Sequence, residues 1–162
     1  MSQEEEFVNL IQQNQGLLYK IASIYTRIPE EQQDLFQEIV YQTWKSFGSY
    51  KKAAKPSTWL YRVGMNTAIS HLNRSKKRIT AVSLEGWESL RLEEYDAGLE
   101  ERVQLLYAEI RKLGLLDRGI VFLFLEDKNY EEIAEIVGIT ASNVGTRLSR
   151  IKEKLRKGVK NN

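Results

Sequence analysis

The sequence predicts an all-α fold in two small helical domains joined by a flexible linker. Apolar residues recur at intervals of three and four along most of the 162 residues, which is helical spacing. Only two prolines interrupt this pattern, Pro29 and Pro56. Residues 77–98 are polar, acidic and weakly periodic, as is typical of a tether. We therefore predict one domain at residues 1–76 and a second at residues 99–162.

The first domain is predicted to contain three helices. The first covers residues 7–26, with Pro29 beyond its end, and the second covers residues 30–47. A loop at residues 48–56 follows, and Ser57 can cap a third helix that runs to about Arg74. The inward side chains of the second helix are predicted to be Leu35, Phe36, Ile39, Val40, Thr43, Trp44 and Phe47.

The second domain is predicted to end in a helix-turn-helix. Helices at residues 99–113 and 117–126 come first, and the latter is very apolar. Asn129 with Glu132 three residues later forms a capping box that starts the next helix at Tyr130. Gly138 supplies a tight exit, and Thr140 can cap the last helix. In the first helix of this pair we expect Ile133, Ala134 and Val137 to face inward.

The last helix has one apolar stripe and one unusual polar face. Val144, Leu148, Ile151 and Leu155 recur at intervals of four, three and four, which predicts burial. Short hydrogen-bonding side chains and cations on the opposite face are typical of a helix that enters the major groove of DNA. A basic amphipathic helix packed on a bundle is the alternative. The opposite face consists of Ser142, Asn143, Gly145, Thr146, Arg147, Ser149, Arg150 and Lys152.

Composition restricts the chemistry that the chain can perform. An apolar fraction of 42% suffices for packed cores, and cysteine is absent, which excludes disulfides and thiolate metal sites. His71 is the one histidine, and no Gly-rich phosphate loop occurs. We expect no enzymatic activity, no metal and no cofactor. The acidic N-terminus is unlike a signal peptide, and no apolar run has membrane-spanning length, so we expect a cytoplasmic protein without membrane insertion.

The net charge of +2 conceals two separate basic blocks. Residues 1–44 hold seven acidic and two basic residues, whereas residues 45–78 hold nine basic and no acidic ones. Residues 147–160 hold seven basic residues and one acidic residue. Two basic blocks indicate two nucleic-acid contact surfaces, although such runs are also found on ordinary solvated faces.

The first basic block contains aromatic residues and a cationic loop. Cations together with the rings of Phe47, Tyr50, Trp59 and Tyr61 suit a surface that holds a single strand, and the loop at residues 48–56 suits capture of a base. The alternative is that these rings are core residues, above all Trp59. The part of the second predicted helix at residues 34–47 has an acidic face opposite its apolar stripe. This face is either solvated or in contact with a protein.

Three motifs in this order resemble one known family. They are DLFQEIV at residues 34–40 followed by Trp44, TWLYRV at 58–63 with NTA at 66–68, and YEEIAEIVGI at 130–139 with RLSR at 147–150. Together they resemble the extracytoplasmic-function (ECF) group of bacterial sigma factors, the promoter-specificity subunits of RNA polymerase. The resemblance covers nearly the whole chain. It departs from the family at Gly145, where Lys or Arg is frequent, and at Ser149, where a larger side chain is common. It also departs at Ile69-Ser70-His71, which replaces the usual Ile-Asp pair.

The resemblance implies a sigma region 2 bundle, a sigma region 4 helix-turn-helix and roles for matching residues. Contacts to the clamp helices of the largest subunit of core polymerase are implied for Asp34, Gln37, Glu38 and Tyr41. Recognition of the minus-ten element, with capture of a flipped base, is implied for Tyr50, Lys51, Lys52, Lys55, Arg62, Asn66, Ser70 and Arg74. Contacts to the minus-thirty-five element are implied for Ser142, Asn143, Thr146, Arg147, Ser149, Arg150 and Lys152, with Arg147 and Lys152 on phosphates.

The function predicted from these features is promoter-specific transcription initiation. The protein would bind core polymerase, recognise and melt promoter DNA, and associate with the nucleoid when bound to polymerase. An anti-sigma factor is a further partner that the family implies. The alternative is a helix-turn-helix repressor or activator that acts as a dimer, against which the two separate basic blocks argue.

Overall fold

The computed structural model describes residues 1–50, 52, 54–79 and 101–161. The described residues form eight α-helices and no strand, so the predicted all-α class is confirmed. The chain divides into two compact units, Met1–Ala81 and Val82–Asn162. Each unit has its own apolar core.

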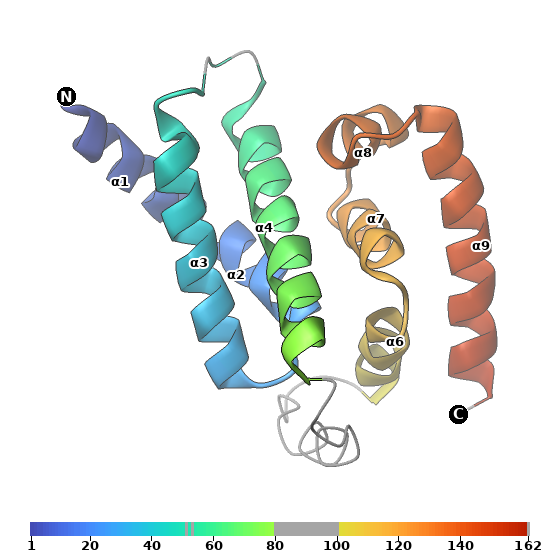
Figure 1. The fold of residues 1–162 in the computed structure, drawn as a ribbon. Coiled ribbons are helices and arrows are strands. Elements are labelled where there is room, and N and C mark those ends of the chain that lie inside the picture. The colour runs from blue at the N-terminus through green and yellow to red at the C-terminus, as the bar shows by residue number, and fades with distance from the viewer. Residues whose placement is uncertain (51, 53, 80–100, 162) are drawn as a thin grey trace. The chain divides into compact units, whose positions relative to one another are not determined.

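The first unit consists of α1 (Gln3–Gln13), α2 (Gln15–Tyr25), α3 (Pro29–Phe47) and α4 (Pro56–Ile79). Helices α3 and α4 run side by side, and α2 packs against both (Figure 1). The core forms where their apolar stripes meet, at the fully buried side chains of Leu18, Ile21, Leu35, Ile39 and Leu60. Proline occupies the first position of both α3 and α4, where a missing N–H group breaks no helical hydrogen bond.

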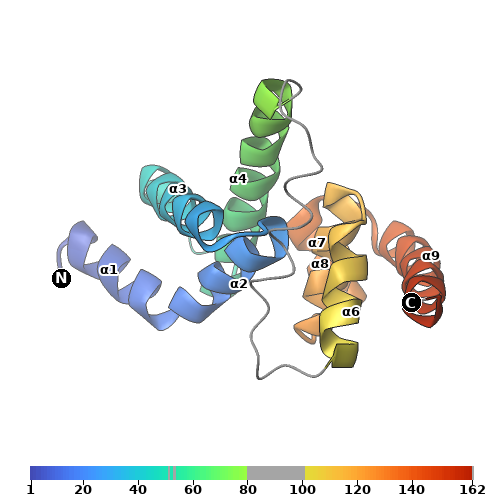
Figure 2. The same cartoon turned by 90° about the horizontal axis from the view of Figure 1, so that it is seen from below.

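The single helix predicted for residues 7–26 is wrong, because the chain bends at Asn14 (Figure 2). The side-chain amide of Asn14 donates to the Leu10 carbonyl at 2.9 Å, and the backbone N–H of Asn14 donates to the Ile11 carbonyl. Asn14 thereby ends α1 with a φ of −121° and serves as the N-cap of α2. Side chains that bind nearby backbone compete with continued helix, whereas the apolar periodicity passes through the bend unchanged.

Helices α2 and α4 approach each other closely at Gly64. A Cβ atom at this position would lie 2.8 Å from Cδ1 of the fully buried Ile21. Glycine at this position leaves room for the Ile21 side chain and so allows the two helices to lie this close together.

Helix α4 continues to Ile79, beyond the predicted end near Arg74 and three residues into the predicted linker. No glycine or proline lies between Gly64 and Ile79, and the Ser-Lys-Lys-Arg run is compatible with a helix. The remainder of the predicted linker lies outside the described residues.

The second unit consists of α6 (Glu101–Arg111), α7 (Leu115–Leu125), α8 (Tyr130–Val137) and α9 (Ala141–Lys160). Its core contains the buried side chains of Ile110, Ile120, Leu123, Ile133, Leu148 and Ile151. The Arg118 guanidinium donates to the carbonyls of Arg111 and Leu113 at 2.7 and 3.1 Å. It thereby satisfies carbonyl groups at the end of α6, which helix termini otherwise leave without partners.

The caps predicted for the helix-turn-helix are confirmed. The Asn129 side chain accepts from the Glu132 N–H at 2.8 Å, and the Glu132 carboxylate accepts from the Asn129 N–H at 3.2 Å. Gly138 has a φ of +80°, and Thr140 accepts from the Asn143 N–H at 3.1 Å.

The apolar face of α8 differs from the prediction in one respect. Ile136 is buried together with Ile133, whereas Ala134 and Val137 are half-buried. Residues three apart share a helix face, so the pair Ile133 and Ile136 forms the packed ridge. The stripe of Val144, Leu148, Ile151 and Leu155 on α9 is buried as predicted. Among the described helices, none is both long enough and apolar enough to cross a membrane.

Candidate nucleic-acid interface

The polar face of α3 is open to solvent at most of its predicted contact residues. Asp34, Gln37 and Tyr41 are exposed, the last by 55%. The Lys45 ammonium lies 5.5 Å from the centre of the Tyr41 ring. Trp44, predicted to face inward, is 39% exposed, although its ring packs against Phe7 at a centroid distance of 5.0 Å. This face therefore combines a carboxylate with two accessible aromatic rings.

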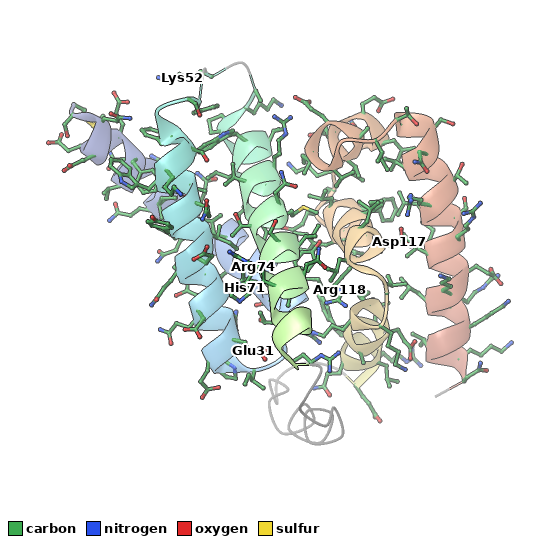
Figure 3. The ribbon with its side chains drawn as sticks, in the orientation of Figure 1. Glu31, Lys52, His71, Arg74, Asp117 and Arg118 are labelled. Atoms are coloured by element: carbon green, nitrogen blue, oxygen red, sulfur yellow. The ribbon has the colours of Figure 1, made fainter. Side chains whose placement is uncertain are left out.

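Glu38 differs from its neighbours because its side chain lies toward α4. Its carboxylate forms an ion pair with Arg74 at 3.7 Å and accepts from the Gln42 amide at 3.2 Å. Arg74 lies on α4 on the side of α3 (Figure 3). A residue predicted to contact polymerase and one predicted to contact DNA therefore touch each other.

A groove of about 590 Å³ lies between α3 and α4. Asn66, Ser70 and Arg74, three of the predicted minus-ten residues, line its α4 side. Amide, hydroxyl and guanidinium groups of this kind can hydrogen-bond to base edges and phosphates. The other lining residues are Glu38, Gln42, Ser46, Val63, Thr67 and Asn73.

The loop between α3 and α4 is fixed at Tyr50. The Tyr50 ring stacks on Trp59 at 4.6 Å, and its hydroxyl donates to the Ala54 carbonyl at 2.9 Å. Trp59 is buried, as the core interpretation expected. Lys52 lies in this loop (Figure 3), has a φ of +56° and is exposed, as is Lys55. Arg62 is half-buried, and Lys51 lies outside the described residues.

The solvent face of α9 carries most of the residues predicted to contact the minus-thirty-five element. The exposed ones are Ser142, Asn143, Thr146, Ser149, Arg150 and Lys152. Gly145 lies against α8, because a Cβ there would be 3.3 Å from Cε2 of Tyr130. A larger residue at this position would therefore have to displace the Tyr130 ring.

Arg147 is the exception, because its guanidinium is engaged within the unit. It donates to the Asp117 carboxylate at 2.9 Å, and both side chains are partly buried. Asp117 lies on the side of α7 that faces α9 (Figure 3). Lys152 also contacts α7, with its ammonium 4.4 Å from the centre of the Phe124 ring. Helical spacing indicates neither partner, because Asp117 and Phe124 lie about thirty residues away from these cations along the chain.

Two models of one family match this chain in the order of its two units. The sigma-70 region 2 model matches residues 10–78, and the sigma-70 region 4 model matches residues 104–155. The chain belongs to the sigma-70 family. As a sigma factor it directs RNA polymerase to promoters, and its partners are RNA polymerase and promoter DNA.

Curated relatives place this sigma factor in the ECF group. It is 29% identical over 141 residues to RNA polymerase sigma factor SigV of Bacillus subtilis, an alignment that covers 85% of this chain and 81% of the relative. It is 29% identical over 149 residues to ECF RNA polymerase sigma-E factor of Escherichia coli K12, covering 83% and 78% of the two chains.

Solved structures share the fold of this sigma factor. The sigma factor RpoE of Bartonella quintana, solved in complex with the anti-sigma factor NepR, has a TM-score of 0.76 at 16% identity, covering 96% of this chain and 98% of RpoE. CnrH, solved in complex with the cytosolic domain of CnrY, has a TM-score of 0.70 at 18% identity, covering 98% and 90% of the two chains.

Proposed function

We propose that this sigma factor binds core polymerase through α3 and contacts the promoter at two elements through separate surfaces. The observation that carries the proposal is the arrangement of unlike surfaces on adjacent helices. Helix α3 exposes Asp34 and the rings of Tyr41 and Trp44, whereas α4 presents polar and cationic side chains without a carboxylate among its described residues. The first composition suits a protein partner, and the second suits DNA.

Binding of α3 to the clamp helices of the largest polymerase subunit is the first part of this proposal. Asp34, Gln37 and Tyr41 are accessible, and exposed aromatic rings are enriched at protein interfaces. Glu38 would join them through the part of its side chain that Arg74 leaves open, since that side chain is 31% exposed.

Recognition of the minus-ten element by the loop and α4 is the second part. Lys52, Lys55 and Arg74 supply exposed cations, and Asn66 and Ser70 supply hydrogen-bonding groups that line the same groove as Arg74. Tyr50, Lys51 and Arg62 complete the proposed set. Opening about ten base-pair steps costs on the order of 14 kcal/mol, and each captured base returns about 1–3 kcal/mol. This surface therefore needs the contacts of polymerase to melt a promoter.

Recognition of the minus-thirty-five element by α9 is the third part. Ser142, Asn143 and Thr146 lie in the first two turns of α9, where a recognition helix meets base edges. Ser149 and Arg150 follow on the same exposed face. The proposed role is binding rather than catalysis.

Control by an anti-sigma factor is a further part of the proposal. RpoE of Bartonella quintana was solved with the anti-sigma factor NepR bound, and CnrH was solved with the cytosolic domain of CnrY bound. We propose that an inhibitor of the NepR kind binds this chain in uninduced cells. Repeated purification of the chain from uninduced cells without any such protein would count against this part.

Run-off transcription with purified core polymerase on a pooled promoter library tests the function. Specific initiation that requires the chain is expected, and the enriched promoters would reveal both elements. Sequence-selective duplex binding by a dimer of the chain, without any stimulation of polymerase, would contradict the proposal and favour a repressor.

Charge reversal on α3 tests the polymerase contact. Asp34→Lys is cleaner than a change at Glu38, because Glu38 also contacts Arg74. We expect Asp34→Lys to weaken binding to core polymerase and Glu4→Lys, the same change on exposed α1, to leave it intact. Equal affinities for both variants and the wild type would refute the assignment.

A further inference from the structure

Two cations lie on opposite borders of the buried stripe of α9. A helix turns about 100° per residue. Arg147 therefore lies about 70° to one side of the centre of the stripe formed by Val144, Leu148, Ile151 and Leu155. The same geometry places Lys152 about 70° to the other side. Both side chains therefore start at the boundary between core and solvent rather than at the centre of the exposed face.

Both cations contact the same helix. Arg147 donates to Asp117 in the first turn of α7 at 2.9 Å, and the Lys152 ammonium lies over the ring of Phe124 in the last turn of α7. Asp117 is also well placed with respect to the dipole of α7, since carboxylates near a helix N-terminus are stabilised. The pair is partly buried, with side-chain exposures of 35% for Arg147 and 24% for Asp117.

A phosphate contact from Arg147 would have to break this pair. The guanidinium would exchange one anionic partner for another, and the Asp117 carboxylate would lose its partner close to the negatively charged DNA. Neither change is required of Arg150 or Lys154. Both are exposed, and neither has an ion-pair partner among the described residues.

Arg150 and Lys154 also lie on the proposed DNA face. They are four residues apart, so they are neighbours on the helix surface, on the side that carries Asn143 and Thr146. Arg156 and Lys157 differ from them, because both form ion pairs with Glu153.

We propose that Arg147 and Lys152 are positioning residues that fix α9 on α7, and that Arg150 and Lys154 contact the phosphates of the minus-thirty-five element. This inference rests on the proposed function of α9 and changes the roles that the family resemblance implied for Arg147 and Lys152. It adds Lys154 as a DNA-contact residue. A signal for Lys154 was present in the sequence, since it follows Arg150 by one helical turn.

The salt dependence of DNA binding distinguishes a phosphate contact from a positioning role. Each neutralised phosphate contributes about 0.9 to the slope of log K against log salt concentration. The full chain assembled with core polymerase would be titrated against an upstream duplex that carries the minus-thirty-five element found by run-off transcription. The variants are Arg150→Gln, Lys154→Gln, Arg147→Gln and Lys152→Gln.

We expect Arg150→Gln and Lys154→Gln each to flatten the slope by about 1 without changing the thermal unfolding midpoint of the chain. Arg147→Gln and Lys152→Gln should lower that midpoint and weaken DNA binding by the same factor at every salt concentration, with the wild-type slope. A slope reduced by about 1 in Arg147→Gln or Lys152→Gln, or unchanged in Arg150→Gln or Lys154→Gln, would overturn the proposal.

Asp117→Asn tests the same pair from its other side and does not alter a cation. It should reproduce the lowered unfolding midpoint of Arg147→Gln and keep the wild-type slope. An unfolding midpoint equal to that of the wild type would show that the Arg147–Asp117 pair does not fix α9 on α7, and would overturn the positioning role. Failure of the proposed function itself would look different, because the wild-type complex would then show no preference for duplexes that carry the element.

Discussion

The ring of Tyr50 stacks on that of Trp59, with centroids 4.6 Å apart and planes 17° from parallel. The Tyr50 hydroxyl donates to the Ala54 carbonyl, four residues along the chain. One aromatic side chain therefore attaches the loop to the core through its ring and closes the loop on itself through its hydroxyl.

Tyr50 is expected to act on promoter opening by ordering this loop. Tyr50→Phe removes the hydrogen bond, which should destabilise the ordered loop by about 0.5–1.5 kcal/mol. Tyr50→Ala also removes the ring stack, which should destabilise the loop by about a further 0.5–1.5 kcal/mol. A fluorescent base analogue in the minus-ten element would measure opening by the polymerase complex, with Tyr50→Phe intermediate between wild type and Tyr50→Ala. Equal loss in both variants would contradict the contribution of the ring stack.

Gly64→Ala is expected to destabilise the first unit. The added methyl group would lie 2.8 Å from Cδ1 of Ile21, and overpacking of this kind typically costs about 1–3 kcal/mol. Gly16→Ala on α2 is the control, because a Cβ there meets no atom within 4 Å, and alanine should stabilise that helix by up to about 1 kcal/mol. Denaturant unfolding would compare the two, and a Gly64→Ala variant as stable as wild type would show that Ile21 can move aside.

Gly138→Ala is expected to weaken the helix-turn-helix. A φ of +80° is costly for residues with a Cβ, by roughly 1–2 kcal/mol. Gly138→Asn should cost less, because asparagine tolerates this conformation. The thermal unfolding midpoint and the affinity for the minus-thirty-five duplex should both decrease in the order glycine, asparagine, alanine at position 138. A different order would place the effect in a side-chain contact instead.

Glu153→Gln is expected to strengthen DNA binding. Glu153 lies on the solvent face of α9, forms an ion pair with Lys157 at 3.9 Å and also pairs with Arg156. Removing its charge eliminates a repulsion from phosphates and releases two cations, so the salt slope should steepen by about 0.9 for each phosphate newly contacted. Loss of each of these ion pairs within α9 should lower the free energy of unfolding by only about 0.2–0.5 kcal/mol. Weaker binding by the variant would indicate that Glu153 accepts a hydrogen bond from a base.

Local chemistry determined which parts of this structure were predictable. Asn129, Gly138 and Thr140 act on backbone within a few residues of themselves, so the sequence predicts their caps correctly. The bend at Asn14 was missed because the same kind of local bond interrupts a helix there while the apolar spacing continues. The Arg147–Asp117 pair joins residues thirty positions apart, and no spacing rule connects them.

The exposed position of Trp44 also depends on a distant residue. Its place on α3 is at the border of the apolar face, where Phe7 from α1 covers only part of the ring. Helical periodicity does not distinguish a buried from an exposed residue at this border. The position of α1 determines how much of the Trp44 ring is exposed.

Helix α1 has one buried side chain, that of Phe7, which contacts the rings of Trp44 and Phe47 at centroid distances of 5.0 and 5.4 Å. Regions with few buried apolar contacts open locally at a free energy far below that of global unfolding. Helix α1 should therefore exchange its amide hydrogens well before α2, α3 and α4. Each such opening would expose more of the Trp44 and Phe47 rings to water while the rest of the bundle stays folded.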